Sequence, residues 1–443
     1  MDTTTRDTTP FVARRRRLAG LLDGAVAVIA TAPERVRNRD ALHPFRFDSY
    51  FYYLTGFDEP EAVLVLAGGE SPRSILFCRT KDPDKEVWDG FRWGPEAARE
   101  AFGFDEARPI AELDAAMPDL LADRPAVYCA VGADPAWDAR VIGWINAVRV
   151  RVRSGVAAPE EIRDVRAALD EMRLVKDEHE VGVMRRAAVI SCAAHRRAMA
   201  FARPGVFEYE VEAELVHEFR RRGAQALAYS PIVAGGANAC VLHYVANRER
   251  LRDGDLLLID AGCELDGYAS DITRTFPVNG AFSAAQQAIY ELVLAMQSAA
   301  MQTIRPGATW NAPHDAALQV LAQGLIDLGL VAGSPDEVLE KETYKPFYMH
   351  RTGHWLGLDV HDAGDYKRAG SWRPLEPGMT FTVEPGCYVR PGDGVPEKFW
   401  NIGVRIEDDV VVTAGGCEVL TADAPKTIDG LTAWMRESRR DAA

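Results

Sequence analysis

Three features are scarce in this sequence, and each scarcity excludes a class of protein. No apolar run approaches the roughly 20 residues that a membrane-spanning helix needs. The seven cysteines among 443 residues are scattered and never form a C-x-x-C pair, which is typical of reduced thiols in a cytoplasm. Positive charge is in deficit, with 51 lysines and arginines against 66 acids and a net charge of −15. We therefore expect a cytoplasmic protein with no nucleic-acid partner and no membrane partner.

The length of the chain predicts two domains. A chain of 443 residues exceeds what one hydrophobic core usually fills. Up to about Met172 the sequence mixes strand-like segments such as 61–68 and 126–132 with helical ones, and the polar segment 153–164 resembles a boundary. We expect a mixed α/β protein, with an N-terminal α/β domain in residues 1–172 and a second domain in residues 173–443.

The second domain carries an internal duplication. Helical patterns over 178–203 and 208–222 recur as a second pair, which begins at a capping box on Ser283 and ends near residue 328. Each helix pair is followed by a strand of one template, "GDLLLIDAG" and then "GMTFTVEPG", with an acid six residues after the first glycine. This pattern predicts two helix–helix–sheet units around a pseudo-two-fold axis. It makes Asp260 equivalent to Glu384, and Asp271 matches Glu407 in "GVRIEDDVVVT" in the same way.

The first of these strands places two acids on one face. The apolar run 256–259 is typical of a strand buried on both faces, yet it ends in Asp260. Asp266-Gly267 is a strong hairpin signal. A two-residue turn there puts Asp271 opposite Gly262 and diagonal to Asp260, whereas a four-residue loop puts the two acids directly opposite each other. Either register leaves the carboxylates roughly 4.5–8 Å apart, where they repel unless a cation lies between them.

Four equivalent acids and a nearby imidazole predict a pair of divalent metal ions. Hard oxygen ligands with one nitrogen favour manganese or a similar ion, and no cysteine occupies a ligand position. The segment "MHRTGHWLGLDVHD" supplies the candidate imidazoles of His350, His354 and His361. His243, which precedes the Asp260 strand, is placed to line the same cavity.

These motifs resemble a known family. "LIDAGCELDGYASDITRTFPV", "GHWLGLDVHD", "LEPGMTFTVEPGCYV" and "GVRIEDDVVVT" are similar to aminopeptidase P, the Xaa-Pro aminopeptidases of the pita-bread metallopeptidase superfamily. "HPFRFDSYFYYLTGFDEPEAVLVL" and "RTKDPDKEVWDGFRWG" resemble the N-terminal domain of that family. The resemblance implies a pita-bread catalytic domain after an N-terminal domain that serves oligomerisation and substrate access.

The resemblance also implies a ligand set and a reaction. The implied ligands of two Mn²⁺ ions per chain are Asp260, Asp271, His354, Glu384 and Glu407. Asp271 and Glu407 would bridge both ions, and a metal-bridging hydroxide would attack the peptide bond between an N-terminal residue and a following proline. The partners would be peptides with proline in second position and other copies of the chain, in a homodimer or homotetramer.

Further roles follow from the same resemblance. Glu384 would accept and relay a proton, His243 and His361 would stabilise the reacting amide, and Arg405 would orient a ligand carboxylate. The implied substrate-binding residues are His350, Tyr366 and Trp88. Arg351 follows His350 where many relatives carry another residue, which affects the shape of the proline-side pocket.

Three alternatives share the fold. A prolidase has the same chemistry but accepts only Xaa-Pro dipeptides, and assays on dipeptides and longer peptides separate the two. A creatinase-like hydrolase does not need the full metal set. A metal-free binding protein of this fold would lack ligands, and a metal assay tests that alternative.

Overall fold

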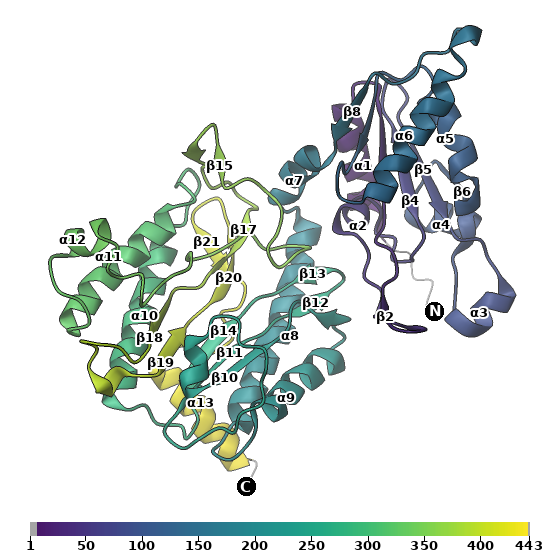
Figure 1. Cartoon of the computed structure of the whole chain (residues 1–443). Helices are drawn as coiled ribbons and strands as arrows, with labels where there is room; N and C mark the ends of the chain where they lie inside the picture. Colours follow the sequence, from purple (N-terminus) through teal and green to yellow (C-terminus); the bar gives the residue numbers. More distant parts are fainter. Residues whose placement is uncertain (1–6, 442–443) are drawn as a thin grey trace. The chain divides into compact units, whose positions relative to one another are not determined.

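The computed structural model describes residues 7–441, shown in Figure 1. The chain falls into two compact units, which divide between Met172 and Arg173. Helix α7 (Arg166–Leu174) carries the chain across that division. Within the described residues, no helix is both long and apolar enough to cross a membrane.

The first unit is built on a six-stranded mixed sheet. Its strand order is β6-β5-β4-β1-β7-β8, in which β4 pairs antiparallel with β1 and β5, and the other neighbours are parallel. The strands of this sheet are β1 (Val26–Ala30), β4 (Val63–Ala67), β5 (Arg73–Cys78), β6 (Glu106–Pro109), β7 (Ala126–Cys129) and β8 (Glu161–Asp164). A short hairpin of β2 (Val36–Asn38) and β3 (Ala41–Leu42) stands apart from it.

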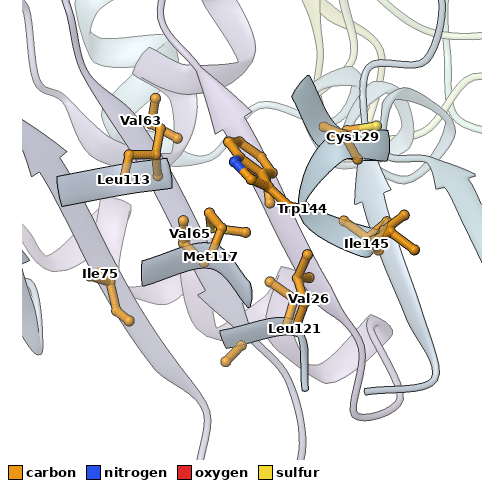
Figure 2. Close-up of a cluster of buried hydrophobic side chains, with 14 of the residues drawn as sticks. Val26, Val63, Val65, Ile75, Leu113, Met117, Leu121, Cys129, Trp144 and Ile145 are labelled. Carbon is orange, nitrogen blue, oxygen red and sulfur yellow. The ribbon is translucent and has the colours of Figure 1, made fainter. Parts of the chain in front are cut away.

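Apolar strands and two covering helices form the core of this unit. Side chains of β1, β4, β5 and β7 pack against one face of α5 and α6, with Trp144 at the centre of the cluster in Figure 2. The alternate strand residues point to the other face, where α1 and α2 contact β1 and β4. The helices are α1 (Thr9–Leu21), α2 (Ser49–Thr55), α3 (Pro83–Asp89), α4 (Gly94–Phe102), α5 (Leu113–Leu121) and α6 (Pro135–Arg149), with short 3-10 turns η1 (Ile110–Glu112) and η2 (Val152–Ser154).

The second unit contains two helix pairs and several short sheets. Its helices are α8 (Glu178–Phe201), α9 (Glu208–Arg221), α10 (Ala284–Thr303), α11 (Ala312–Asp327), α12 (Pro335–Glu340) and α13 (Ile428–Asp441), with 3-10 turns η3 (Gly236–Cys240) and η4 (Glu397–Phe399). The strands of its first half are β9 (Ala226–Leu227), β10 (Ile232–Gly235), β11 (Leu256–Asp260), β12 (Cys263–Leu265), β13 (Tyr268–Ala269) and β14 (Thr273–Pro277). Those of its second half are β15 (Lys367–Arg368), β16 (Ser371–Trp372), β17 (Thr380–Val383), β18 (Gly386–Val389), β19 (Ile402–Arg405), β20 (Asp408–Val412) and β21 (Cys417–Val419).

The predicted duplication of helices is confirmed. Helices α8 and α9 pack against each other, as do α10 and α11. Capping boxes begin the long helix of each pair, from Asp177 in α8 and from Ser283 in α10. Helix α8 contacts β12 and β13 of the first half, and α10 contacts β17, β18 and β19 of the second. The mixed α/β class predicted from the sequence is also confirmed.

The hairpin after β11 has the two-residue turn. Asp266 and Gly267 both have positive φ, of 49° and 82°, which the twist of a tight hairpin requires. Leu265 pairs with Tyr268, and Asp260 pairs with Thr273. This register places Asp271 opposite Gly262 and diagonal to Asp260, so the first of the two predicted registers is correct.

The second half uses the same template with a different register. Val383 pairs with Asp408 and Gly386 with Arg405, which puts Glu384 opposite Glu407 between them. The two acids face each other directly here, whereas in the first half they are diagonal. The duplication therefore repeats the residues of the site and not the whole geometry of its strands.

Gly262 permits the close approach of the two chain segments that carry the first acids. A Cβ atom at this position would lie 1.7 Å from the carbonyl oxygen of Ser270, the residue before Asp271. We expect Gly262→Ala to push these segments apart and to lower the Tm by about 5–10 °C, because the clash is with backbone and cannot relax cheaply. Differential scanning calorimetry under fixed metal conditions measures this change.

The control for this substitution is Gly182→Ala in α8, where an added Cβ would meet nothing within 4 Å. That variant should be as stable as the wild type or slightly more so, because alanine favours helix. A Gly262→Ala protein with a Tm equal to that of the control would contradict the close-approach argument.

Candidate metal centre

The predicted ligands converge in one cavity of the second unit. The cavity has a volume of about 790 Å³, within the range of small-molecule sites. Asp260 ends β11, Asp271 lies before β14, Glu384 follows β17 and Glu407 precedes β20, while His354 comes from the loop after α12. All five line this cavity. Two pairs of strand ends and one loop therefore build the site.

The donor atoms of these residues lie within reach of a common ion. The Nε2 atom of His354 is 3.5 Å from Oδ2 of Asp271 and 3.6 Å from Oε1 of Glu384. Ligand atoms of Asp271, His354 and Glu407 all lie within 4.8 Å of one another. Oxygen donors with one imidazole nitrogen are a donor set for a hard divalent cation, so the residues present fit the predicted metal.

The imidazole of His354 has the orientation of a ligand. Its Nδ1 atom is 2.9 Å from the carbonyl oxygen of Trp355. A carbonyl only accepts hydrogen bonds, so Nδ1 carries the proton and the lone pair of Nε2 faces the carboxylates. The sequence places His354 among three candidate histidines. His350 makes the same kind of contact with the carbonyl oxygen of Arg351, but its Nε2 atom lies 2.9 Å from the hydroxyl of Tyr388, whereas Nε2 of His354 faces Asp271 and Glu384.

The carboxylates are held in an electrostatically costly arrangement. Burial, followed by the charge of Asp260, raises the pKa of Asp271 well above its usual value. Burial, followed by the charges of Asp271 and Glu384, does the same to the pKa of Glu407. Burial also raises the pKa of Glu384. Like charges in a low dielectric disfavour ionisation, and divalent cations would remove that penalty.

One arginine offsets part of this charge and links the site to a hydrogen-bond chain. Arg405 donates from Nη2 to Asp260 Oδ2 at 2.6 Å and from Nη1 to the hydroxyl of Tyr388 at 3.0 Å. Tyr388 is in turn 2.9 Å from Nε2 of His350. The Nε of Arg405 also donates to Thr273, whose hydroxyl donates to Glu407 at 2.6 Å. The structure thus places Arg405 where it orients Asp260 directly and Glu407 through one hydroxyl.

Tyr229 is a site residue that sequence reasoning missed. Its buried hydroxyl donates to Asp260 Oδ1 at 2.6 Å and contacts Oδ1 of Asp271. Burial, followed by the charges of these two acids, raises the pKa of Tyr229 well above its usual value, so it stays protonated and remains a donor. Its position in "AYSP" carries no motif, and only the fold brings it to the acids.

A buried ion pair supports the second half of the site from behind. Arg274 donates to Asp408 Oδ1 at 2.7 Å, and both side chains are 0% exposed. The same guanidinium donates to the backbone carbonyls of Thr273 and Glu407. Lys426 donates to the other oxygen of Asp408 at 2.6 Å. Burial alone would raise the pKa of Asp408. The charges of Arg274 and Lys426 nevertheless hold this pKa below its usual value.

The other predicted residues divide between the cavity and the first unit. His243, His350, His361 and Tyr366 line the cavity. The ring of His361 lies 4.3 Å from that of His354, and burial lowers its pKa. Burial lowers the pKa of His350 to about 3, so it is neutral. Trp88 belongs to the first unit, on α3, and is 87% exposed.

Comparison with known proteins identifies the family. Residues 182–414 match metallopeptidase family M24, and residues 11–128 match the aminopeptidase P N-terminal domain. The chain is 44% identical over 433 residues to the Xaa-Pro aminopeptidase of Escherichia coli K12, covering 97% of this chain and 98% of that protein. It aligns with aminopeptidase PepP of Pseudomonas aeruginosa at a TM-score of 0.96 and 50% identity, over 99% of this chain and 100% of that one. Zinc-substituted E. coli aminopeptidase P in complex with product aligns at a TM-score of 0.95 and 44% identity, over 98% of this chain and 100% of that one.

Fold, site and the M24 match together define a metallopeptidase with a pita-bread catalytic domain. The chain belongs to the Xaa-Pro aminopeptidases, the aminopeptidase P group of family M24. The predicted family, fold and class of enzyme, a metal-dependent Xaa-Pro aminopeptidase, are confirmed.

The raised pKa values of the buried acids predict a pH-dependent response to metal. In metal-stripped protein, Asp271 and Glu407 keep protons that the unfolded chain releases above about pH 4, so their contribution to stability falls as pH rises through the folded pKa. Metal replaces these protons. We expect the free energy of stabilisation by Mn²⁺, observed as a gain in Tm, to grow from pH 5.5 to pH 8 by about 1.4 kcal/mol per pH unit for each proton displaced.

Thermal scans of stripped and loaded protein across that pH range measure the gain. Titrating groups of the first unit do not line the cavity, so their contributions are alike in both forms and cancel in the difference. A gain that stays constant with pH would show that the acids are already ionised without metal.

Proposed function

We propose that this chain removes the N-terminal residue from peptides whose second residue is proline, with two Mn²⁺ ions as cofactor. The observation that carries the proposal is the convergence of four carboxylates and one imidazole in a single cavity. Arg405 is the only lysine or arginine that forms an ion pair with these four acids within the described residues. The site therefore has more negative charge than the protein itself neutralises.

The five ligands divide between two ions. Asp260 would hold one ion, His354 and Glu384 the other, and Asp271 and Glu407 would serve both. The hydrogen-bonded contact of Tyr229 with both Asp260 and Asp271 supports this division, because it holds the two carboxylates side by side. When bound, a pair of divalent ions supplies hydroxide at neutral pH and polarises the substrate carbonyl.

The side chains around the ligands carry the remaining steps. Glu384 lines the cavity beside His354 and would accept a proton and pass it to the leaving nitrogen. His361, neutral because burial lowers its pKa, is placed to donate an N–H to the developing oxyanion. His243 lines the same cavity and is proposed for the reacting amide. Arg405 keeps Asp260 oriented through the hydrogen bond from its Nη2 atom.

A proline-specific site makes physical sense here. The bond before proline is a tertiary amide without an N–H, and the ring restricts the local backbone. Peptidases that bind an extended strand through that N–H handle it poorly. Apolar and aromatic side chains next to the acids, among them Trp310 and Tyr366, offer a surface for the ring. His350, held by Tyr388, is proposed to border the proline, and the free α-amine would face the acids.

His361 separates catalysis from metal binding. We expect the wild type to bind two Mn²⁺ per chain and to release the first residue from Ala-Pro-Ala but not from Ala-Ala-Ala. His361→Ala should keep both ions while kcat falls by about a hundredfold or more, as for the loss of an oxyanion donor. Metal analysis and mass spectrometry of products measure both quantities.

Loss of a metal ion together with activity in His361→Ala would make His361 a ligand and overturn its assignment. Cleavage of the Ala-Pro dipeptide with no cleavage of longer peptides would identify a prolidase instead. Full activity after exhaustive chelation would contradict the metal mechanism as a whole.

Trp88 supports a proposal about assembly. Trp88 does not belong to the hydrophobic core of its own unit, because it is 87% exposed. Its neighbour Val87 is 82% exposed. Helix α3 has no buried residue, so these apolar side chains form a patch that another surface would cover. We propose that the N-terminal unit mediates a homodimer or homotetramer in the cytoplasm, with Trp88 at the interface or next to substrate.

We expect Trp88→Ala to raise KM or lower kcat on Xaa-Pro peptides with the Tm nearly unchanged, because 87% of Trp88 is exposed and little of it packs within its own unit. Steady-state kinetics, calorimetry and light scattering measure these quantities. Val150→Ala is the control, since Val150 is an apolar residue of comparable exposure, 82%, elsewhere on the first unit. A monomeric wild type, together with a Trp88→Ala variant of unaltered kinetics, would contradict the proposal.

A further inference from the structure

Arg351 is a charged residue of the cavity that the catalytic scheme does not use. It lines the cavity together with the metal ligands. Within the described residues no carboxylate lies within 4 Å of its guanidinium, whereas the other arginine of the cavity, Arg405, is paired with Asp260. Arg351 is therefore a cation without an ion-pair partner in a cavity whose other charges are mostly negative.

Neutral groups hold Arg351 in place. Its Nη2 atom donates to the side-chain oxygen of Asn311, and its Cζ atom lies 5.1 Å from the centre of the Trp372 ring. The amide of Asn311 donates to Asp315 at 2.6 Å, which leaves its oxygen directed at Arg351. The Nζ of Lys367 lies over the same Trp372 ring at 4.2 Å and adds positive charge there. The guanidinium is thus oriented, yet most of its donors stay available.

The substrate of the proposed reaction would meet these charges in a fixed order. Its free amine would lie among the acids, and the peptide would then leave the metal ligands past His350, the residue next to Arg351. A guanidinium binds carboxylates through two parallel hydrogen bonds, with a geometry that lysine does not provide. The complementary group on a peptide is a carboxylate beyond the proline.

We propose that Arg351 is a specificity-determining residue that binds a substrate carboxylate on the C-terminal side of the proline residue. This inference rests on the proposed function. Two sources share the chemistry: the chain terminus of an Xaa-Pro-Yaa tripeptide, and the side chain of an acidic residue after proline in a longer peptide. The enzyme then prefers peptide substrates that carry a carboxylate after the proline over neutral peptides of equal length.

Two matched peptide pairs separate the sources. Ala-Pro-Ala and its C-terminal amide differ only in the terminal carboxylate. Ala-Pro-Glu-amide and Ala-Pro-Gln-amide differ only in the side-chain carboxylate. We expect the wild type to favour the charged member of at least one pair by about fivefold to tenfold in kcat/KM, through KM, as for a partly exposed charge-assisted contact.

Arg351→Met keeps the length of the side chain and removes its charge, so the preference should fall to about onefold with the metal content and kcat on the amides unchanged. Arg351→Lys should recover part of the preference. Lys341→Met is the control, because Lys341 pairs with Glu337 on α12 and does not line the cavity. This control changes the net charge equally and should leave the preference as in the wild type.

The outcomes distinguish this inference from the proposed function. A wild type that cleaves none of the four peptides would remove the proposed function itself. Equal preferences in the wild type and Arg351→Met would overturn the role of Arg351 alone. The role of Arg351 would also be overturned if Arg351→Met changed only the cleavage of the Ala-Pro dipeptide, whose carboxylate belongs to the proline. A loss of kcat on the amides in this variant would overturn it as well.

Discussion

The mutual repulsion of four carboxylates in one cavity, two of them buried and two half-buried, is the constraint on which the second unit depends. Asp260, Asp271, Glu384 and Glu407 come from two separate strand pairs, and burial raises the pKa of three of them. Burial and the neighbouring negative charges both destabilise the ionised carboxylates. The arrangement persists because strands and a buried polar network hold the backbone around it, and because a divalent cation can be bound there.

That network shows how the fold sustains an unfavourable site. Arg405 and Tyr229 contact the acids themselves, whereas Arg274 and Asp408 act on the backbone behind Glu407. Gln297 of α10 adds donors to the carbonyls of Val383 and Ile406, the residues just before Glu384 and Glu407. The positions of the four acids are therefore held by contacts from elements far away in the sequence. This redundancy is what keeps donor atoms close enough to share an ion.

Site features that depend on neighbouring residues in the sequence were predictable, whereas those that depend on contacts between distant segments were not. Asp260 and Glu384 could be found because each comes at the end of an apolar strand of a repeated template. Asp271 and Glu407 could be found because they hold matching positions in the two halves, and the Asp266-Gly267 turn set the register around Asp271. The equivalence of the halves did not reveal that Glu384 faces Glu407 directly while Asp260 lies diagonal to Asp271. Tyr229 lies in no motif, and Tyr388 lies in a family motif that gives it no role, so only their hydrogen bonds assign them to the site.

The sequence by itself determined the classes of element, the repeated acids and the family, because hydrophobic periodicity, turn chemistry and motif spacing are local properties. The tertiary structure decided which histidine presents its lone pair to the acids and which tyrosine holds them together. It also decided that Arg351 contacts the amide of Asn311, with no carboxylate within 4 Å among residues 7–441. Those features depend on side chains that meet across long stretches of chain. Burial and hydrogen-bond direction at such meetings are set by packing, which no local pattern encodes.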